Sequence, residues 1–157
     1  MNYRLQQWKP NVTVAAVIEH HGLFLLVEEE TRFGIRYNQP AGHLEAGESL
    51  IDAVIRETLE ESARDFLPQA LLGIYQYAHP EDGVTYLRFA FTGRISAQRP
   101  GQKLDEGIRR TLWMSPGEIR DCADRHRSPL LLRCMDDHLA GQHYPLQAIQ
   151  HLVPTAP

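Results

Sequence analysis

The sequence predicts an α/β protein in which a mixed β-sheet is covered by a helix on each face. Short runs rich in Val, Ile and Phe, which are typical of strands, occur both before and after a segment with helical periodicity. A second helical segment follows the last of these runs. The order strands, helix, strands, helix buries the apolar stripes most simply in this architecture. The length of 157 residues is typical of one domain, so we expect residues 1–157 to form a single domain.

Composition and charge exclude several classes of protein. The net charge is -4 and the pI is near 6.0, which argues against binding to a nucleic-acid polymer. No apolar run approaches the roughly 18 residues that a membrane span requires. Residues 1–11 lack the apolar stretch of a signal peptide. Cys122 and Cys134 are not in CxxC spacing and are expected to be free thiols. These observations predict a cytoplasmic protein that does not bind a nucleic-acid polymer or a membrane.

The first two strands are expected over residues 12–18 and 23–29. Both runs are rich in Val, Ile, Leu or Phe, and His21–Gly22 between them predicts the turn of a hairpin. Pro40 and the glycine two residues later then predict that the chain leaves regular structure.

A helix is expected from residue 50 to about residue 63. Its apolar residues recur at spacings of three and four and form one stripe, consisting of Ile51, Val54, Ile55 and Leu59. Pro68 prevents the helix from continuing beyond it, because proline has no amide hydrogen and clashes with the preceding turn.

Three further strands and two further helices complete the expected fold. The strands cover residues 70–78, 85–95 and 109–114, the first two being joined by a polar turn. Ser115 and Glu118 form a capping-box pattern with a proline at the first helical position, which predicts a helix start. Another helix is expected from Ser128 to Gly141, and one short helical turn is expected in the last stretch.

Three glutamates of the first helix, Glu57, Glu60 and Glu61, fall together on the side opposite the apolar stripe. Glu60 has arginines four residues away on both sides, whereas Glu57 and Glu61 have none. Two interpretations stay open. The acidic face is either a solvated surface or a site for a hard divalent cation such as Mg²⁺ or Mn²⁺. An acidic cluster open to solvent would indicate phosphate chemistry, since Mg²⁺ fills its remaining positions with water and phosphate oxygens.

The wider pattern resembles the Nudix box, the signature of the Nudix hydrolases. Over residues 42–64 it places Gly42, Glu48, Arg56–Glu57 and Glu60–Glu61 at the offsets of that motif. The resemblance implies an α/β/α sandwich with a mixed sheet between helices. It also implies Mg²⁺-dependent hydrolysis of a nucleoside diphosphate linked to another group.

The resemblance also implies roles for individual residues. The metal ligands correspond to Glu57, Glu60 and Glu61, together with the backbone carbonyl of Gly42. Arg56 corresponds to the arginine that orients the glutamates, and Glu48 corresponds to the acid that supports the box.

The general base differs among Nudix enzymes, so more than one residue stays open. Glu57 is the first choice. Asp105 or Glu106, in the loop before the strand at 109–114, is the second, although both also fit an ordinary polar loop.

Three positions of the box depart from the consensus. Thr58 replaces an apolar residue, Ala63 replaces the glycine after the helix, and Arg64 replaces the last apolar residue. Because the glycine is missing, two ends of the helix stay open: near residue 63, or further along the chain toward Pro68.

A narrower resemblance covers most of the chain. The segments YNQPAGHLEA (37–46), YLRFAF (86–91) and RSPLLLRCMDDHLAGQHYPL (127–146) are similar to those of the NudJ-type phosphatases. That group implies hydrolysis of nucleoside tri- and diphosphates, thiamine pyrophosphate or its hydroxymethylpyrimidine (HMP) pyrophosphate precursor, with release of orthophosphate.

Two alternatives to this activity stay open. One is a Nudix pyrophosphatase for ADP-ribose or dinucleoside polyphosphates. The other is a non-catalytic nucleotide-binding module, which would be expected to lack glutamates of the box. The sequence leaves open whether the protein is a monomer or a homodimer.

For each candidate substrate-binding residue the sequence leaves two interpretations open. Arg88 either binds a phosphate or pairs with an acid on a neighbouring strand, and Asn38 either contacts a base or simply forms a turn. Tyr86 and Trp113 either stack on a ring or belong to the core. At least one of the glutamates at 28–30 is expected to face inward.

Overall fold

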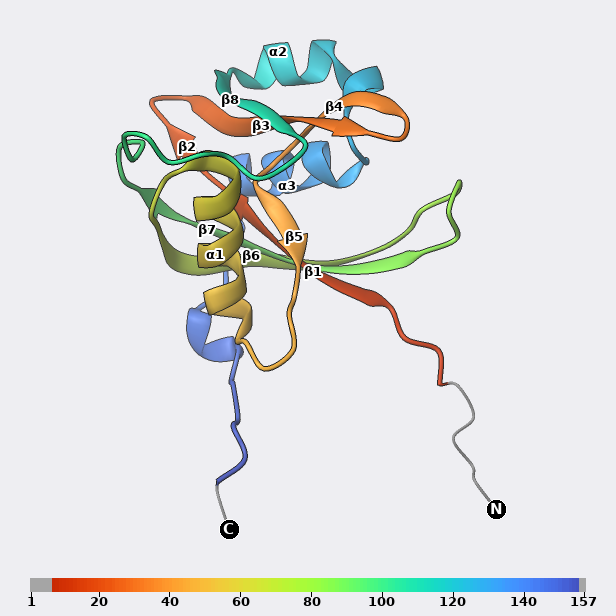
Figure 1. The fold of residues 1–157 in the computed structure, drawn as a ribbon, viewed down its shortest axis with the longest axis vertical. Helices are drawn as coiled ribbons and strands as arrows, with labels where there is room; N and C mark the ends of the chain where they lie inside the picture. Colours follow the sequence, from red (N-terminus) through yellow and green to blue (C-terminus); the bar gives the residue numbers. More distant parts are fainter. Residues whose placement is uncertain (1–6, 156–157) are drawn as a thin grey trace.

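The computed structural model describes residues 7–155 (Figure 1). Its strands are β1 (Asn11–Val17), β2 (Glu19–His20), β3 (Leu23–Thr31), β4 (Gly34–Asn38), β5 (Ala41–His43), β6 (Phe66–Ala78), β7 (Thr85–Ile95) and β8 (Ile108–Met114). Its helices are α1 (Leu50–Ser62), α2 (Pro116–Asp121) and α3 (Leu130–Leu139), with short 3₁₀ turns η1 (Ala123–Arg125) and η2 (Leu146–Ala148).

The described strands form two sheets. The first has the order β5-β1-β7-β6 and is mixed, because β1 runs parallel to β7 whereas the other pairs are antiparallel. In the second sheet β3 pairs antiparallel with β2, β4 and β8. The predicted α/β sandwich with a mixed sheet is confirmed. The division of the strands into two sheets was not predicted.

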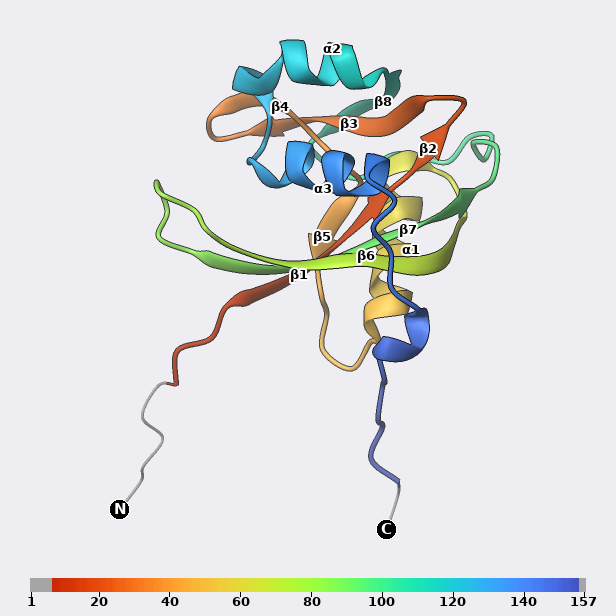
Figure 2. The ribbon, with the colours of Figure 1, turned by 180° about the vertical axis from the view of Figure 1, so that it is seen from behind.

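Helices cover both faces of the mixed sheet, as β1 illustrates. Val14, Ala16 and Ile18 point into a core cluster that includes residues of α1. Ala15 and Val17 point to the opposite side, into a cluster that includes residues of α2 and α3. Figures 1 and 2, which view the molecule from opposite sides, show α1 and α3 on either side of this sheet. Burial on both faces explains why the strand has a nearly continuous apolar sequence.

The predicted hairpin between residues 12–18 and 23–29 is wrong. β1 lies between β5 and β7 in the first sheet, whereas β3 belongs to the second. The partner of β3 across the turn is the two-residue strand β2. The turn itself lies where it was expected: His21 and Gly22 have φ of 51° and 77°, as in the primed turns that close two-residue hairpins. The chain changes sheets between the end of β1 and β2, a change that local patterns do not reveal.

The first helix ends near residue 63, the earlier of the two ends that the sequence left open, and does not continue toward Pro68. α1 ends at Ser62, and Ala63 adopts the left-handed conformation that glycine usually takes (φ 55°, ψ 33°). Its amide donates to the carbonyl of Leu59 at 2.8 Å. This conformation costs about 1 kcal/mol for alanine, and the complete burial of the Ala63 methyl group offsets much of it. Pro68 lies inside β6, where the register with β7 is irregular.

The orientation of α1 differs from the prediction. Ile51, Ile55 and Leu59 of the apolar stripe are only partly buried. The fully covered side of the helix consists of Ala53, Val54, Glu57, Thr58, Glu61 and Ser62. This happens because α1 packs against β1, β5 and β6 of one sheet and also against β8 of the other. Two of the three glutamates therefore face the interior.

Three further predictions about local structure hold, whereas the expected loss of regular structure after Pro40 does not, because β5 begins at Ala41. The Ser115–Glu118 capping box is present at the start of α2, Gly141 follows α3 with φ of 78°, and η2 is the short turn expected near the end. No helix of the described part of the chain is long and apolar enough to cross a membrane.

Candidate active site

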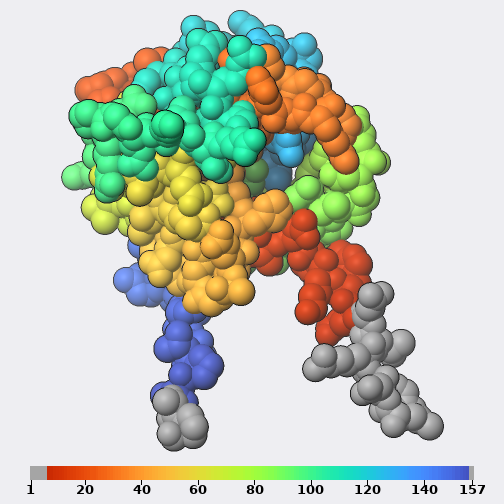
Figure 3. Space-filling model, in the orientation of Figure 1, coloured from red at the N-terminus to blue at the C-terminus, as the bar shows by residue number. Residues whose placement is uncertain are grey.

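A cavity of about 750 Å³ opens beside the buried face of α1. Its walls come from α1, β5, the β3–β4 hairpin, the β6–β7 hairpin and the segment that leads into α3. Figure 3 shows the surface hollowed between the orange β3–β4 hairpin and the green β6–β7 hairpin. One end of the cavity is lined with carboxylates and the other with aromatic rings.

Arg56 is the centre of the hydrogen-bond network on α1. Its guanidinium donates to both oxygens of Glu48 (2.7 and 3.1 Å), to Glu57 Oε1 (2.9 Å) and to Glu60 Oε2 (3.1 Å). It also donates to the carbonyl oxygen of His43 at 3.0 Å. The hydrogen bond from Arg56 holds the pKa of Glu48 below its ordinary value. One planar cation with five donors thus orients three carboxylates and a neighbouring strand.

Gly42 allows the Glu57 carboxylate to lie directly against β5. A Cβ atom built at Gly42 would lie 2.1 Å from the nearest atoms of that carboxylate. Any other residue at this position would therefore displace Glu57.

Glu57 and Glu61 are buried carboxylates with raised pKa values. Burial raises the pKa of Glu57 even though Arg56 acts in the opposite direction. Burial raises the pKa of Glu61 to about 9, and the negative charges of Glu29, Glu57 and Asp105 add to the shift. The backbone amide of Ala41, which donates to Glu61 Oε2 at 2.9 Å, only partly offsets it.

Glu29 is a site residue that the sequence did not single out. It lines the cavity, whereas its neighbour Glu28 is held by arginines elsewhere. Its Oε1 atom is buried without a hydrogen bond, and Arg127 Nε is 3.7 Å away. Burial raises the pKa of Glu29. Alternation along β3 shows that neighbouring glutamates face opposite sides, but only the position of α1 decides which side is the site.

The structure distinguishes the two loop acids and separates Glu60 from the other box glutamates. Both residues are exposed, but only Asp105 lines the cavity, whereas Glu106 lies outside its lining. The amide of Asp105 donates to the carbonyl of Glu60 at 2.8 Å, which ties this loop to α1. The Glu60 side chain is 43% exposed, lies outside the cavity lining and contacts Arg56.

Arg88 lies at the inner end of the cavity and is only 6% exposed. It donates to Gln39 Oε1 at 3.2 Å and lies 3.5 Å from Asn38 Oδ1, and its Nε has no partner. Its neighbours across the strands are Thr13 and Tyr75, and no carboxylate of the described residues is within ion-pair distance. A buried guanidinium without a carboxylate partner is suited to bind an anion.

Tyr86 and Trp113, the two aromatic residues that were expected either to stack on a ring or to belong to the core, lie in different environments. Tyr86 lines the cavity. Trp113 instead packs against the core cluster on the α1 side, with the Arg64 guanidinium 5.8 Å from its ring centroid. Trp113 is therefore a core residue.

The carboxylates fit a divalent cation that is coordinated only partly by protein. The described residues contain no group of three His, Cys, Asp or Glu side chains already arranged around a metal position. However, Mg²⁺ commonly uses only one or two carboxylates and completes its shell with water and phosphate oxygens. Glu57 Oε2 and Glu61 Oε1 accept no hydrogen bond from described residues, and the surrounding donors are oxygen atoms, which Mg²⁺ and Mn²⁺ prefer.

Comparison with known proteins agrees with this geometry. The NUDIX domain family model matches residues 8–134. The chain belongs to the Nudix hydrolase family. Phosphatase NudJ from Escherichia coli K12 is 40% identical over 142 residues, which cover 90% of this chain and 92% of that protein.

Two solved structures have the same fold. A NUDIX hydrolase from Nitrosomonas europaea is 52% identical and superposes with a TM-score of 0.90, covering 92% of this chain and 98% of that one. A bifunctional NMN adenylyltransferase/ADP ribose pyrophosphatase from Francisella tularensis, complexed with AMP and a Mn ion, is 19% identical with a TM-score of 0.67. The match covers 85% of this Nudix chain and 42% of that protein, and it shows a shared fold alone.

Proposed function

We propose that this Nudix hydrolase is a Mg²⁺-dependent phosphohydrolase of the NudJ type. Its substrates would be nucleoside tri- and diphosphates, thiamine pyrophosphate or HMP pyrophosphate, from which it releases orthophosphate. The observation that carries the proposal is the pair of buried carboxylates, Glu57 and Glu61, which share a cavity with the buried and incompletely paired Arg88. The identity to NudJ over 90% of the chain supports the choice of substrates.

The residues that would hold the cation are Glu57, Glu60, Glu61 and the carbonyl of Gly42. Glu60 Oε1 accepts no hydrogen bond from described residues, so this oxygen is available although the other contacts Arg56. Bound Mg²⁺ or Mn²⁺ would neutralise phosphate oxygens and lower the pKa of a coordinated water. Arg56 and Glu48 keep the glutamates oriented before the substrate arrives.

Glu57 is the proposed general base. Its pKa is raised by burial, which brings a carboxylate closer to the range useful for accepting a proton near neutral pH. Asp105 is the second choice and Glu106 a weaker one, because only Asp105 of these two lines the cavity. The base takes the proton of the water that attacks phosphorus.

Arg88 and Asn38 would bind the substrate phosphate or the atoms next to it. Arg88 lines the cavity, its buried Nε has no hydrogen-bond partner among the described residues, and Asn38 Oδ1 lies 3.5 Å from its guanidinium. A phosphate placed there would replace weak contacts by charge-assisted hydrogen bonds.

We further propose that residues 1–157 act as one catalytic domain in the cytoplasm, as a monomer or homodimer. The two cysteines, Cys122 and Cys134, are both free thiols, which fits a reducing compartment.

A substrate panel tests this proposal. Purified enzyme is assayed with ATP, GDP, ADP-ribose and thiamine pyrophosphate in Mg²⁺, with Mn²⁺ and EDTA arms, and products are scored as orthophosphate, pyrophosphate or nucleoside monophosphate. We expect orthophosphate from the nucleotides and thiamine pyrophosphate, and no turnover in EDTA. ADP-ribose as the only good substrate would overturn the NudJ-type assignment.

A further inference from the structure

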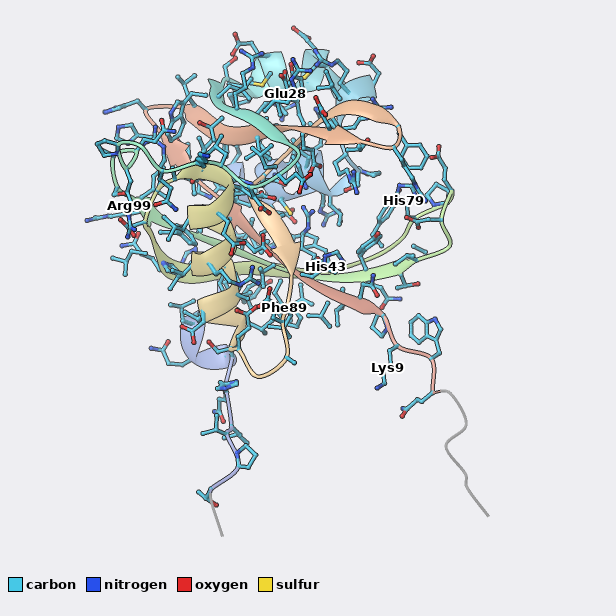
Figure 4. All side chains as sticks on the ribbon, in the orientation of Figure 1. Lys9, Glu28, His43, His79, Phe89 and Arg99 are labelled. Atoms are coloured by element: carbon cyan, nitrogen blue, oxygen red, sulfur yellow. The ribbon has the colours of Figure 1, made fainter. Side chains whose placement is uncertain are left out.

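The tips of two hairpins meet at the mouth of the cavity, although they are far apart in sequence. Arg32 Nη2, on the β3–β4 tip, lies 3.5 Å from Asp82 Oδ2, on the β6–β7 tip. The rings of Phe33 and His79 stack across the same junction, with centroids 6.1 Å apart and an angle of 14° between the rings. Figure 4 places His79 on the β6–β7 hairpin, beside the tip of the β3–β4 hairpin.

The inner wall of this mouth is a pair of tyrosines. Tyr77 of β6 and Tyr86 of β7 are directly opposite in register, so their side chains lie on the same face of the hairpin. That face also carries Arg88, two residues further along β7. From the inside outward, the wall therefore presents a cation, then two tyrosines, then His79, and all four residues line the cavity.

Two of these rings, Tyr77 and Phe33, are not fixed by contacts with the core. Tyr75, the next tyrosine along β6, donates its hydroxyl to Asp137 on α3 at 2.8 Å and is tied to the core. By contrast, the Tyr77 hydroxyl has no hydrogen-bond partner among the described residues, and Phe33 is 39% exposed. Of the four rings Phe33 is exposed and the other three are partly buried, and such partly exposed rings at the mouth of a cavity are typical of a ligand site rather than of a core.

Asp82 adds a hydrogen-bond acceptor to the same place. Its Oδ1 accepts from the amide of Val84 at 2.9 Å, which fixes the carboxylate. Its Oδ2 has only long contacts, to Arg32 and to the Tyr86 hydroxyl, both at 3.5 Å. An N–H group of a ligand could therefore compete for Oδ2 at little cost.

We propose that this outer half of the cavity, formed by Phe33, Tyr77, His79 and Tyr86, binds the planar nitrogen-containing ring of the substrate. This inference rests on the proposed function, in which the diphosphate occupies the inner half between the carboxylates and Arg88. The ring stacks on the aromatic side chains, and its N–H groups face Asp82. Phe33 and Tyr86 are thus specificity-determining residues that distinguish ring-bearing phosphates from ring-free ones.

A pair of non-hydrolysable probes tests the ring site without requiring turnover. The probes are α,β-methylene-ADP, which carries a ring, and methylenediphosphonate, which carries none. Their Kd values are measured by calorimetry in Mg²⁺ for the wild-type protein and for Phe33→Leu and Tyr86→Leu. We expect each substitution to weaken the ring-bearing probe by about 5- to 100-fold, the range for loss of one aromatic stacking partner, while the ring-free probe binds as before.

Matched variants separate ring binding from a structural effect. Phe33→Trp keeps an aromatic ring and should restore binding of α,β-methylene-ADP. Ile74→Ala removes an exposed apolar side chain from the outer face of β6 and should change neither Kd. Equal weakening of both probes, or no weakening of either, would overturn the ring site. If neither probe binds the wild-type protein, the proposed function fails and the ring site fails with it.

Discussion

Glu28, on the second sheet, and the pair Glu57 and Glu61, on α1, have almost the same low solvent exposure but different charge environments. Glu28 is 7% exposed, and Glu57 and Glu61 are 8% and 7% exposed. The pKa of Glu28 lies below its ordinary value, chiefly because of hydrogen bonds from Arg110. The pKa values of Glu57 and Glu61 lie above theirs, because burial is not matched by enough positive charge.

The pKa values differ because burial is the largest influence on Glu57 and Glu61, whereas nearby arginines outweigh it at Glu28. Three arginines surround Glu28: Arg110 at 3.1 Å, Arg109 at 3.6 Å and Arg125 at 3.7 Å. Figure 4 shows Glu28 on the part of the second sheet that faces α2, away from the centre of α1. In the cavity, Arg56 contacts Glu57, but Glu61 has no cationic partner among the described residues. A buried carboxylate satisfied by arginines supports the fold, whereas one left unsatisfied is available for a cation from solution.

The largest expected effect is on catalysis. Glu57→Gln and Glu61→Gln should each lower kcat by about 10²- to 10⁴-fold at saturating Mg²⁺, since each removes a charge that would hold the cation or accept a proton. Steady-state assays measure the loss, and circular dichroism checks that the fold is retained. Near-normal turnover in both variants would contradict the metal-site account.

The second effect is on the pH dependence of stability. The folded-state pKa of Glu61 is raised to about 9 from an ordinary value of 4.5, so its contribution to stability is present below pH 4.5 and is lost as pH rises toward 9. Without divalent cations, Tm should fall across this window. Mg²⁺ should raise Tm more at pH 8 than at pH 5, because it binds the charged form.

Thermal melts in EDTA and in MgCl₂, at both pH values, measure this difference. The matched variant is Glu61→Gln, which cannot ionise and should show a flatter dependence of Tm on pH and a smaller shift with Mg²⁺. If Mg²⁺ raises the Tm of Glu61→Gln as much as that of the wild-type protein, Glu61 does not bind the cation.

The smallest effect is expected at Glu28. Glu28→Gln should lower the free energy of unfolding by about 1 kcal/mol at pH 7, because the arginines around it are partly exposed and screened by solvent, and it should leave kcat unchanged. Since the pKa of Glu28 is lowered, its contribution is present above pH 4.5 and is lost as pH falls. Urea unfolding of both proteins should therefore converge at low pH. A large loss of kcat in the Glu28→Gln variant would contradict the conclusion that Glu28 supports the fold whereas Glu57 and Glu61 support catalysis.

Local patterns were enough to predict most elements of the fold. Helix α1, the capping box at Ser115 and the turn at His21–Gly22 depend on neighbours within a few residues, and they appear where expected. The Arg56 network could also be anticipated, because Glu60 is one helical turn away and the Nudix box fixes the other offsets.

Long-range packing accounts for what was missed. β1 and β3 follow one another in sequence but enter different sheets, so the predicted hairpin failed. Glu29 reaches the cavity only because β3 passes the buried side of α1, and the aromatic junction of Phe33 and His79 joins two separate hairpins. None of these contacts has a periodic signature in sequence.

The sequence by itself determined the α/β class, the helix that carries the box and the identity of its charged residues, because helical spacing is a local property. Only the tertiary structure decided that Glu57 and Glu61 face inward with raised pKa values, whereas Glu28 is neutralised by arginines from β8 and η1. The reason is that the free energy of a buried charge depends on how much water is removed from around it and on which charged residues, distant in sequence, lie close to it. Both are set by how the sheets and helices pack.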